Sequence, residues 1–399
     1  MNQPKLNRVL GVTQVTFYGI GTILGAGIYA LIGKVSGEAG ILAPVSFVIS
    51  AFVAFFTAYS YTQLVNRYPK SAGEAEYVFQ GFNRAWLSNI VGYLVAFTGI
   101  VSSATLVKAI SGYVQVFLNV DDFIISITLL FVITTIVIKG IKESLNLAMI
   151  ITIIEIIGLI LICSVGFDSL VQKNYLFDEI SANLSIEKIA PVLSGAFIAF
   201  YAFIGFEDIV NLAEETKKPG RTILIAIFIS LVLATSLYIL VALVAVASLP
   251  IDALKSSKAP LSDMYIAHGG GIKLMSAIAI FAIINGILAQ IIMASRILYG
   301  IKHPISILKI LSRVNAKTKT PVIATLLVSI TCLLFTVLFP LNSLAGTTSF
   351  IILIVFTLVN AALILTELKL EIKTVWNFIL PTIGIILNLG FLIFRTLEF

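Results

Sequence analysis

The chain has 399 residues, of which 59% are hydrophobic and only 12% are charged, and its mean hydropathy is +1.07. A water-soluble protein carries roughly 25% charged residues, because its surface must be hydrated. The composition therefore excludes a soluble globular fold and predicts a protein embedded in a lipid bilayer. The net charge of +6 does not indicate a nucleic-acid binder, since the basic residues are scattered over short connections and form no basic helix or patch.

Eleven apolar runs are candidates for membrane-spanning helices. A bilayer core about 30 Å thick needs roughly 20 residues of helix, and lipid cannot satisfy backbone polar groups. We therefore predict an all-α integral membrane protein with one membrane domain over residues 1–399. The runs lie at about 9–33, 41–66, 85–118, 122–139, 145–166, 189–213, 222–249, 272–298, 321–339, 343–366 and 374–394.

The basic residues predict the orientation of the chain. If the N-terminus is cytoplasmic, the cytoplasmic connections hold most of the 26 Lys and Arg. The positive-inside rule then fixes the N-terminus in the cytoplasm, and eleven spans place the C-terminus outside. The first run is too long for the core of a cleavable signal, so we expect it to remain as a span of a plasma-membrane protein.

The order of the runs predicts an internal repeat. Five runs precede the loop at 167–188 and five follow it, before an extra C-terminal run at 374–394. An odd number of spans per half gives the halves opposite topologies, which is the arrangement of a five-plus-five inverted repeat. We expect the first repeat at about 9–166 and the second at about 189–366.

The first run is rich in glycine, and Gly25 and Gly27 flank Ala26 near its middle. Glycine destabilises a helix interior, although membrane helices also use it for close packing. The pattern predicts either a packing face or a break in the helix. A break would expose backbone N–H groups at the positive end of a new half-helix, where an anion such as a carboxylate binds.

The sixth run contains a matching interruption. Gly205 lies past its middle, and Glu207 and Asp208 follow closely. Paired interruptions at corresponding places in two halves are typical of a transporter binding site near the bilayer midplane. We therefore expect helices one and six to be broken.

These two interruptions resemble those of the amino acid–polyamine–organocation (APC) superfamily of transporters. Its first span carries a G-(S/A)-G break and its sixth an aromatic, G-(F/V)-E break, matched here at 25–27 and 203–207. The segments 68–74, 214–221, 295–299 and 319–321 also match in the superfamily's order, so the resemblance covers about 9–366. It implies alternating access and amino acid substrates bound between the broken spans. The chain departs from the superfamily in its eleven spans, since twelve are common.

The resemblance also implies how a substrate is held. The α-carboxylate would bind N–H groups just after the first break, and the α-amine would bind carbonyls freed at both breaks. The N–H groups are those of Ala26, Gly27 and Ile28, and the carbonyls are those of Ile23, Tyr201 and Ile204.

The two interruptions and nearby polar or aromatic residues complete the candidate substrate site. Gly25 and Gly205 form the breaks themselves. Tyr201 and Phe203 flank the second break, where the resemblance implies an aromatic lid, and Tyr201 is the candidate gate. Asn285 lies near mid-depth in the eighth run, as does Gln290; a hydrogen bond in helix packing is the alternative for both.

Four ionisable side chains fall inside the predicted spans: Lys108, Glu155, Glu207 and Asp208. A charge at mid-helix costs roughly 2.5 to 3.5 kcal/mol, so each group must be neutralised, paired or in contact with water. Glu155 lies near the bilayer midplane, at a position where some superfamily members have a lysine that stands in for a coupling cation. We hypothesise that Glu155 carries a coupled proton. The alternatives are a permanent pair with Lys108, or a protonated carboxyl bonded to the backbone.

The other three ionisable groups have different expected roles. The resemblance implies that Glu207 links substrate occupancy to the intracellular gate. Asp208 is either functional or simply faces water in the inner vestibule. Lys108 is a candidate for coupling or gating, with a snorkelling or structural role as the alternative.

The expected function is secondary active transport of amino acids, with proton symport. Sodium sites in this fold generally use paired hydroxyls of the eighth span, whereas the eighth run offers Asn285, Gly286 and Gln290. Exchange of one amino acid or amine for another, and an amino acid-binding sensor on the same scaffold, remain open alternatives. A membrane enzyme is not expected, because neither HExxH nor GxSxG occurs. A channel is not expected either, because no repeated pore element is present. The expected partners are an amino acid, protons and the bilayer, with no cofactor, metal or nucleic acid.

Overall fold

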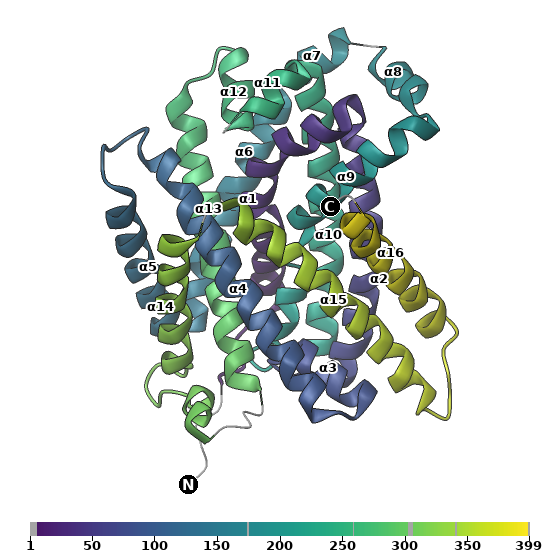
Figure 1. The fold of residues 1–399 in the computed structure, drawn as a ribbon. Coiled ribbons are helices and arrows are strands. Elements are labelled where there is room, and N and C mark those ends of the chain that lie inside the picture. The colour runs from purple at the N-terminus through teal and green to yellow at the C-terminus, as the bar shows by residue number, and fades with distance from the viewer. Residues whose placement is uncertain (1–5, 174, 258, 302–305, 340, 398–399) are drawn as a thin grey trace.

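The computed structural model describes residues 6–173, 175–257, 259–301, 306–339 and 341–397. In these ranges the chain folds into helices and no strand forms, apart from an isolated bridge between Leu10 and Thr216. The predicted all-α fold is confirmed. Figure 1 shows long helices packed side by side, with short helices at both ends of the bundle.

The long helices follow the apolar runs closely. They are α1 (Val12–Ala39), α2 (Ala43–Arg67), α4 (Ala85–Val114), α5 (Asp122–Lys139), α6 (Ile141–Val165), α9 (Ile189–Phe200), α10 (Pro219–Ser248), α13 (Ile272–Gly300), α14 (Val322–Leu338), α15 (Leu341–Leu368) and α16 (Trp376–Leu397).

Short helices occupy the connections. The connection at 167–188 is expected from the sequence only as a loop, but it contains short helices, as does the connection at 250–271, and these helices lie at one end of the bundle (Figure 1). The short α-helices are α3 (Gly73–Phe82), α7 (Phe167–Gln172), α8 (Leu176–Asn183), α11 (Ile251–Ser256) and α12 (Pro260–Ala267). The 3-10 helices are η1 (Gly40–Leu42), η2 (Ile186–Lys188), η3 (Tyr201–Phe203), η4 (Glu207–Leu212) and η5 (Ser306–Ser312).

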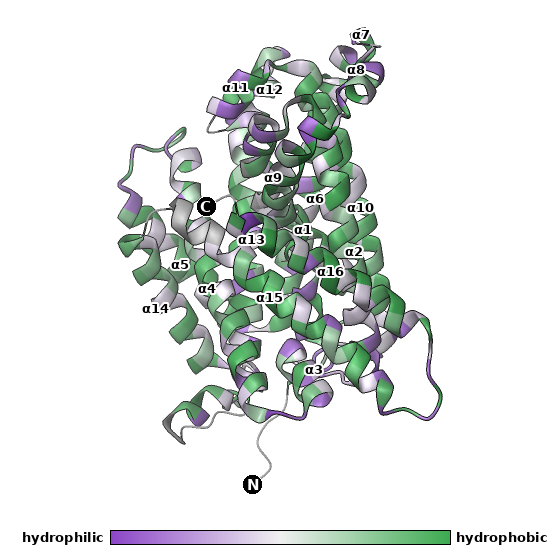
Figure 2. Cartoon of the chain, turned by 45° about the vertical axis from the view of Figure 1, so that its right-hand side comes forward, coloured by the Kyte–Doolittle hydropathy of each residue, from purple (hydrophilic) through white to green (hydrophobic). Residues whose placement is uncertain are grey.

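The helices are long and apolar enough for a membrane protein. Among the described residues, nine helical stretches meet the length and hydropathy expected of a span, and α14 is a shorter apolar helix. All eleven predicted runs fall on helices, the sixth on the series α9, η3 and η4. Many large apolar residues are exposed on the outside of the bundle; Phe131, for example, is 73% exposed. In Figure 2 most of the length of the long helices has the colour of hydrophobic residues. Helices that are apolar all round suit a lipid environment. The two repeats expected within this bundle stay a prediction.

Polar side chains join the helices in the interior. The Asn360 side chain of α15 accepts a hydrogen bond from Ser60 and donates one to Thr57, both on α2, at 2.6 and 3.0 Å. The Ser50 hydroxyl of α2 donates to the carbonyl of Ala196 in α9 at 2.6 Å. Without a hydrophobic driving force between helices in lipid, such bonds and close packing hold the bundle together.

The bundle has two ends that matter for function. The N-terminal face contains the Leu10–Thr216 bridge, α3 and η5; the opposite face contains α7, α8, α11 and α12 (Figure 1). At the N-terminal face, the backbone N–H of Lys217 donates to the Leu10 carbonyl, and Leu10 donates to the carbonyl of Glu215. The segment before α1 is thereby tied to the segment after η4.

Candidate functional site

The first helix is broken where the glycine pattern predicted. Gly25 has φ −30° and ψ −146°, which is not helical, within the otherwise helical Val12–Ala39. The N–H groups of the next residues start a new half-helix and have no carbonyl one turn before them to bind. The break therefore presents backbone donors, and the positive end of a helix dipole, inside the bundle.

The sixth span is broken more extensively. The α-helix ends at Phe200, η3 follows, and Ile204 is extended at φ −61° and ψ 131°. Gly205 has φ +130°, a conformation that residues with a Cβ rarely adopt. A Cβ at this position would also lie 2.8 Å from the carbonyl oxygen of Thr22 in α1. Glycine is thus required by both the conformation and the contact with α1. The expected second half-helix is the 3-10 segment η4, as short helical pieces often are.

Two hydroxyl groups tie the breaks together. The Thr22 hydroxyl lies 3.0 Å from the carbonyl oxygen of Gly205. The Tyr238 hydroxyl, from α10, contacts the carbonyl oxygens of Ile23 and Ala202, the latter at 3.0 Å. A phenol has one proton to donate, so these two carbonyls share it. Tyr238 was missed by the sequence reasoning, in which its only signal was a polar atom within an apolar run.

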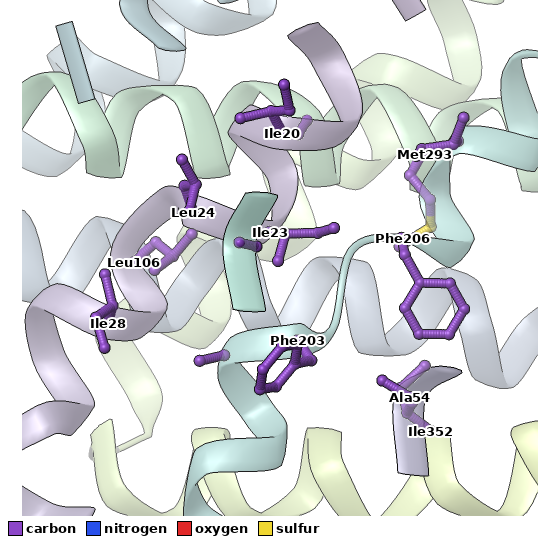
Figure 3. Close-up of a cluster of buried hydrophobic side chains, with 14 of the residues drawn as sticks. Ile20, Ile23, Leu24, Ile28, Ala54, Leu106, Phe203, Phe206, Met293 and Ile352 are labelled. Atoms are coloured by element: carbon purple, nitrogen blue, oxygen red, sulfur yellow. The ribbon is translucent and has the colours of Figure 1, made fainter. Parts of the chain in front are cut away.

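A small cavity lies between the two breaks. Its volume is about 40 Å³, which is less than an amino acid occupies. Of the predicted substrate-binding residues, Ile23, Gly27, Tyr201 and Ile204 line it. Figure 3 shows Ile23 and Phe203 at the facing breaks, with Leu106 of α4 nearby. The full lining is Thr22, Ile23, Gly27, Ser102, Leu106, Tyr201, Ala202, Ile204, Gly286 and Gln290.

The remaining predicted residues lie around the cavity rather than in its lining. The Phe203 ring packs against the Tyr238 ring, with centroids 5.2 Å apart. Gly25 faces α13, where a Cβ would make ordinary contacts with Ala282 and Gly286. Ile28 is fully buried on the second half of α1. Gly27, which does line the cavity, approaches η3 so closely that a Cβ would lie 2.8 Å from the Cα of Ala202.

Asn285 points away from the cavity and toward Glu155. Its amide nitrogen donates to the Glu155 carboxylate oxygen Oε1 at 3.1 Å and to the Thr152 hydroxyl at 3.0 Å. Thr152 in turn donates to the carbonyl of Phe17 in α1 at 3.2 Å. Glu155 is fully buried, and its second oxygen, Oε2, has no hydrogen-bond partner in the described structure. The Glu155 carboxyl thus links α6 to α13 through Asn285. The same Asn285 amide is connected to α1 through the Thr152 hydroxyl.

Lys108 is occupied elsewhere. Its ammonium group donates to the carbonyl oxygens of Thr336 and Phe339, at 3.1 and 2.7 Å, and so caps the C-terminal end of α14. A cation at a helix C-terminus is favoured by the helix dipole. This geometry supports the structural alternative for Lys108 and separates it from Glu155, whose donor is Asn285.

Glu207 and Asp208 follow the second break and are both buried. A Glu207 carboxylate oxygen accepts from the backbone N–H of Gly205 at 2.8 Å, so Glu207 satisfies a donor that the break frees. An Asp208 oxygen accepts from the Gln290 amide at 2.7 Å, while its other oxygen, Oδ1, has no partner in the described structure.

Close contacts between helices lie on either side of the two breaks. Toward the N-terminal face, Arg296 of α13 and Glu215 form an ion pair at 3.3 Å, with both side chains fully buried. Toward the opposite face, α11 lies against α1, where a Cβ at Gly33 would lie 2.3 Å from the carbonyl oxygen of Leu254.

Glu74 is a further buried carboxyl at the N-terminal face that sequence reasoning missed. Burial raises its pKa to about 7. Glu74 lies in α3, which packs against α4 and α15. It also lies near enough to Glu207 for the two carboxyls to repel each other.

The profile of a family described as "Amino acid permease" matches residues 10–397. The chain belongs to the amino acid permease family. The resemblance to the APC superfamily is thereby confirmed over nearly the whole chain.

The individual relatives share only about a quarter of their aligned residues with this chain. "Cationic amino acid transporter 3, mitochondrial" of Arabidopsis thaliana is 26% identical over 387 residues, which are 91% of this chain and 63% of that protein. "Branched-chain amino acid permease BcaP" of Bacillus subtilis is 26% identical over 399 residues, with 92% and 82% covered. "Cationic amino acid transporter 4" of Homo sapiens is 25% identical, with 92% and 61% covered. The chain thus spans about three fifths of the length of the plant and human relatives.

Proposed function

We propose that the permease is a secondary active transporter that carries amino acids across a membrane by alternating access, with a proton as the coupling ion. The observation that carries this proposal is the cavity between two broken spans. Its family and its relatives, which are named as amino acid transporters and permeases, support the same substrate class.

The breaks provide complementary groups for an amino acid zwitterion. The N–H groups of Ala26, Gly27 and Ile28 begin a half-helix and would hold the α-carboxylate. The carbonyls of Ile23, Tyr201 and Ile204 would accept hydrogen bonds from the α-amine. The amine competes with Tyr238 for the Ile23 carbonyl, so substrate binding would release part of the tie between the breaks.

Transport requires the cavity to expand and to open to each side in turn. Since about 40 Å³ is too small for an amino acid, α1 and the segment from α9 to η4 have to separate on binding. The Arg296–Glu215 contact at the N-terminal face and the contact between α11 and α1 would then open alternately. The Lys and Arg distribution favours a cytoplasmic N-terminal face. The plasma membrane is the proposed location. Some relatives are named as vacuolar or mitochondrial, so the location is to be tested by membrane fractionation.

Glu155 is the proposed proton carrier. An ionised carboxylate that receives a single hydrogen bond in a buried site is costly, and a proton on Oε2 would remove the charge. Because the Glu155 network reaches both α1 and α13, a change in its charge would alter the contacts between these two helices. Glu207 and Tyr201 are proposed to couple substrate occupancy to the gates, since both adjoin the second break.

The test is uptake of labelled amino acids into proteoliposomes, with and without an inward pH gradient, in sodium-free and sodium-containing buffers. A gradient of one pH unit can drive about tenfold accumulation of the amino acid if one proton is carried with each amino acid. We expect this stimulation in the parent and in Glu179→Gln, a matched control on the exposed face of α8. We expect its loss in Glu155→Gln, with uptake down the substrate gradient retained.

Three other results would replace the proposal. Full stimulation in Glu155→Gln would dismiss Glu155 as the proton carrier. Uptake that requires amino acid preloaded inside the vesicles would indicate an exchanger. Binding of amino acids without any flux would indicate a sensor.

A further inference from the structure

Gln290 is a polar residue of the cavity lining that the proposed zwitterion contacts do not use. Its amide nitrogen donates to Asp208 at 2.7 Å. With the nitrogen committed to Asp208, the carbonyl oxygen Oε1 is the part of the amide left to accept a hydrogen bond from a group in the cavity.

Asp208 behind it is an unusually placed acid. It is 1% exposed, and its oxygen Oδ1 has no hydrogen-bond partner in the described structure. The groups that face it are Tyr18 from α1, Gln290 from α13, and the carboxyls of Glu207 and Glu74. None of these is a cation.

No basic side chain forms an ion pair with Asp208 among the residues that the structure describes. Ion pairs form instead between Arg67 and Glu367 and between Arg296 and Glu215. Arg296, on the same helix as Gln290, is held by Glu215. The acidic group at this end of the cavity therefore has no protein cation to balance it.

A buried charge without a partner is costly, and a bound cation that supplies the missing charge binds more tightly for that reason. We propose that Gln290 and Asp208 form the side-chain end of the substrate site and select amino acids whose side chains end in a cation, an ammonium or a guanidinium. The cation donates to Gln290 Oε1 and balances the charge on Asp208. An uncharged side chain of equal length supplies no such charge, so Asp208 has to be neutralised by a proton instead, as proposed for Glu155.

This inference rests on the proposed function, because the α-carboxylate and α-amine have to be held at the breaks for the side chain to reach Gln290. Residues of both breaks and Gln290 line the same cavity, so one extended amino acid would reach all three once the cavity has expanded. The relatives are divided between proteins named for cationic and for branched-chain amino acids, so their names do not decide the matter.

The experiment compares substrates of nearly equal size that differ in charge: lysine with norleucine, and arginine with citrulline. Uptake into proteoliposomes is measured at zero membrane potential, set by valinomycin with equal potassium on both sides. The parent is expected to prefer the cationic member of each pair by about tenfold or more. Asp208→Asn keeps the shape and the hydrogen bond to Gln290, and is expected to remove most of that preference, measured as the ratio of lysine to norleucine uptake.

Two further variants complete the test. Gln290→Leu removes the amide and is expected to lower the lysine to norleucine ratio as well; it also serves if Asp208→Asn fails to elute as a folded protein. Asp178→Asn, on exposed α8, makes the same chemical change away from the cavity and is expected to keep the parent ratio.

The outcomes separate the two levels of proposal. A parent that prefers norleucine and citrulline, or variants at Asp208 and Gln290 that keep the parent ratio, would overturn this inference and leave amino acid transport intact. Absence of both binding and uptake for every amino acid would overturn the proposed function and this inference together.

Discussion

Two buried glutamates show how differently a membrane protein can treat the same side chain. Glu215 is fully buried and paired with the guanidinium of Arg296, where the ion pair joins α13 to the segment after η4. Glu155 is equally buried, and each of the two acids has one oxygen without a partner in the described structure, but the donor to Glu155 is the neutral amide of Asn285. The guanidinium beside Glu215 favours its ionised form, whereas a neutral amide does not favour either charge state of Glu155 as strongly. This difference suits Glu215 to holding a closed face and Glu155 to coupling.

The largest effect is expected from breaking the Glu215 pair. Arg296→Met leaves a buried carboxylate without its cation, which typically costs 3 to 5 kcal/mol. We expect a strongly lowered thermal unfolding midpoint in detergent, and a partial recovery when Glu215→Leu is added. The double-mutant cycle measures the coupling, and a double variant no more stable than Arg296→Met would contradict the pairing. Glu155→Gln, by contrast, is expected to leave the midpoint nearly unchanged.

Glu74 offers a comparison in which pH is the variable. Burial raises its pKa from 4.5 to about 7, so the folded protein keeps a proton that the unfolded chain loses between these two values. Stability therefore falls as the pH rises through this window, by up to about 3 kcal/mol above pH 7. Glu74→Gln stays neutral, so its stability relative to the parent is expected to rise between pH 5 and pH 8. Unfolding midpoints at both pH values check this, and a constant difference would refute it.

Gly205 tests whether the second break is required. Gly205→Ala places a Cβ at φ +130° and 2.8 Å from the Thr22 carbonyl, and strain of this kind costs roughly 1 to 3 kcal/mol. We expect lower stability and loss of most uptake, because the break and α1 have to move apart. Gly112→Ala is the matched control, since nothing lies within 4 Å of a Cβ there. Equal uptake by the two variants would argue against a functional break.

Tyr238 gives the smallest expected effect. Tyr238→Phe removes the hydroxyl that contacts Ile23 and Ala202, and a hydrogen bond of this kind contributes about 1 kcal/mol. We expect a slightly less stable protein. We also expect that substrate raises its unfolding midpoint more than that of the parent, because the Ile23 carbonyl is free for the α-amine. Thermal unfolding with and without substrate measures both effects, and an unchanged substrate response would exclude competition at Ile23.

The outline of the site was predictable because it depends on local sequence. Gly25 lies near the middle of a glycine-rich apolar run and Gly205 lies past the middle of another apolar run, and the cost of glycine in a helix acts within one turn of the chain. Their positions therefore predicted both breaks. The cavity lining was less predictable: Ser102 and Leu106 come from α4, a helix apolar on all sides, and their sequence does not indicate which side faces the cavity.

The sequence by itself determined the membrane class, the positions of the spans and the two interruptions, since hydropathy and glycine act along the chain. Only the tertiary structure decided the partners of buried polar groups: Glu155 with Asn285 rather than Lys108, Asp208 with Gln290, and Tyr238 with the breaks. These pairings depend on how each helix is rotated about its axis. In lipid, apolar residues are stable on every side of a helix, so the sequence pattern does not fix that rotation and contacts between helices do.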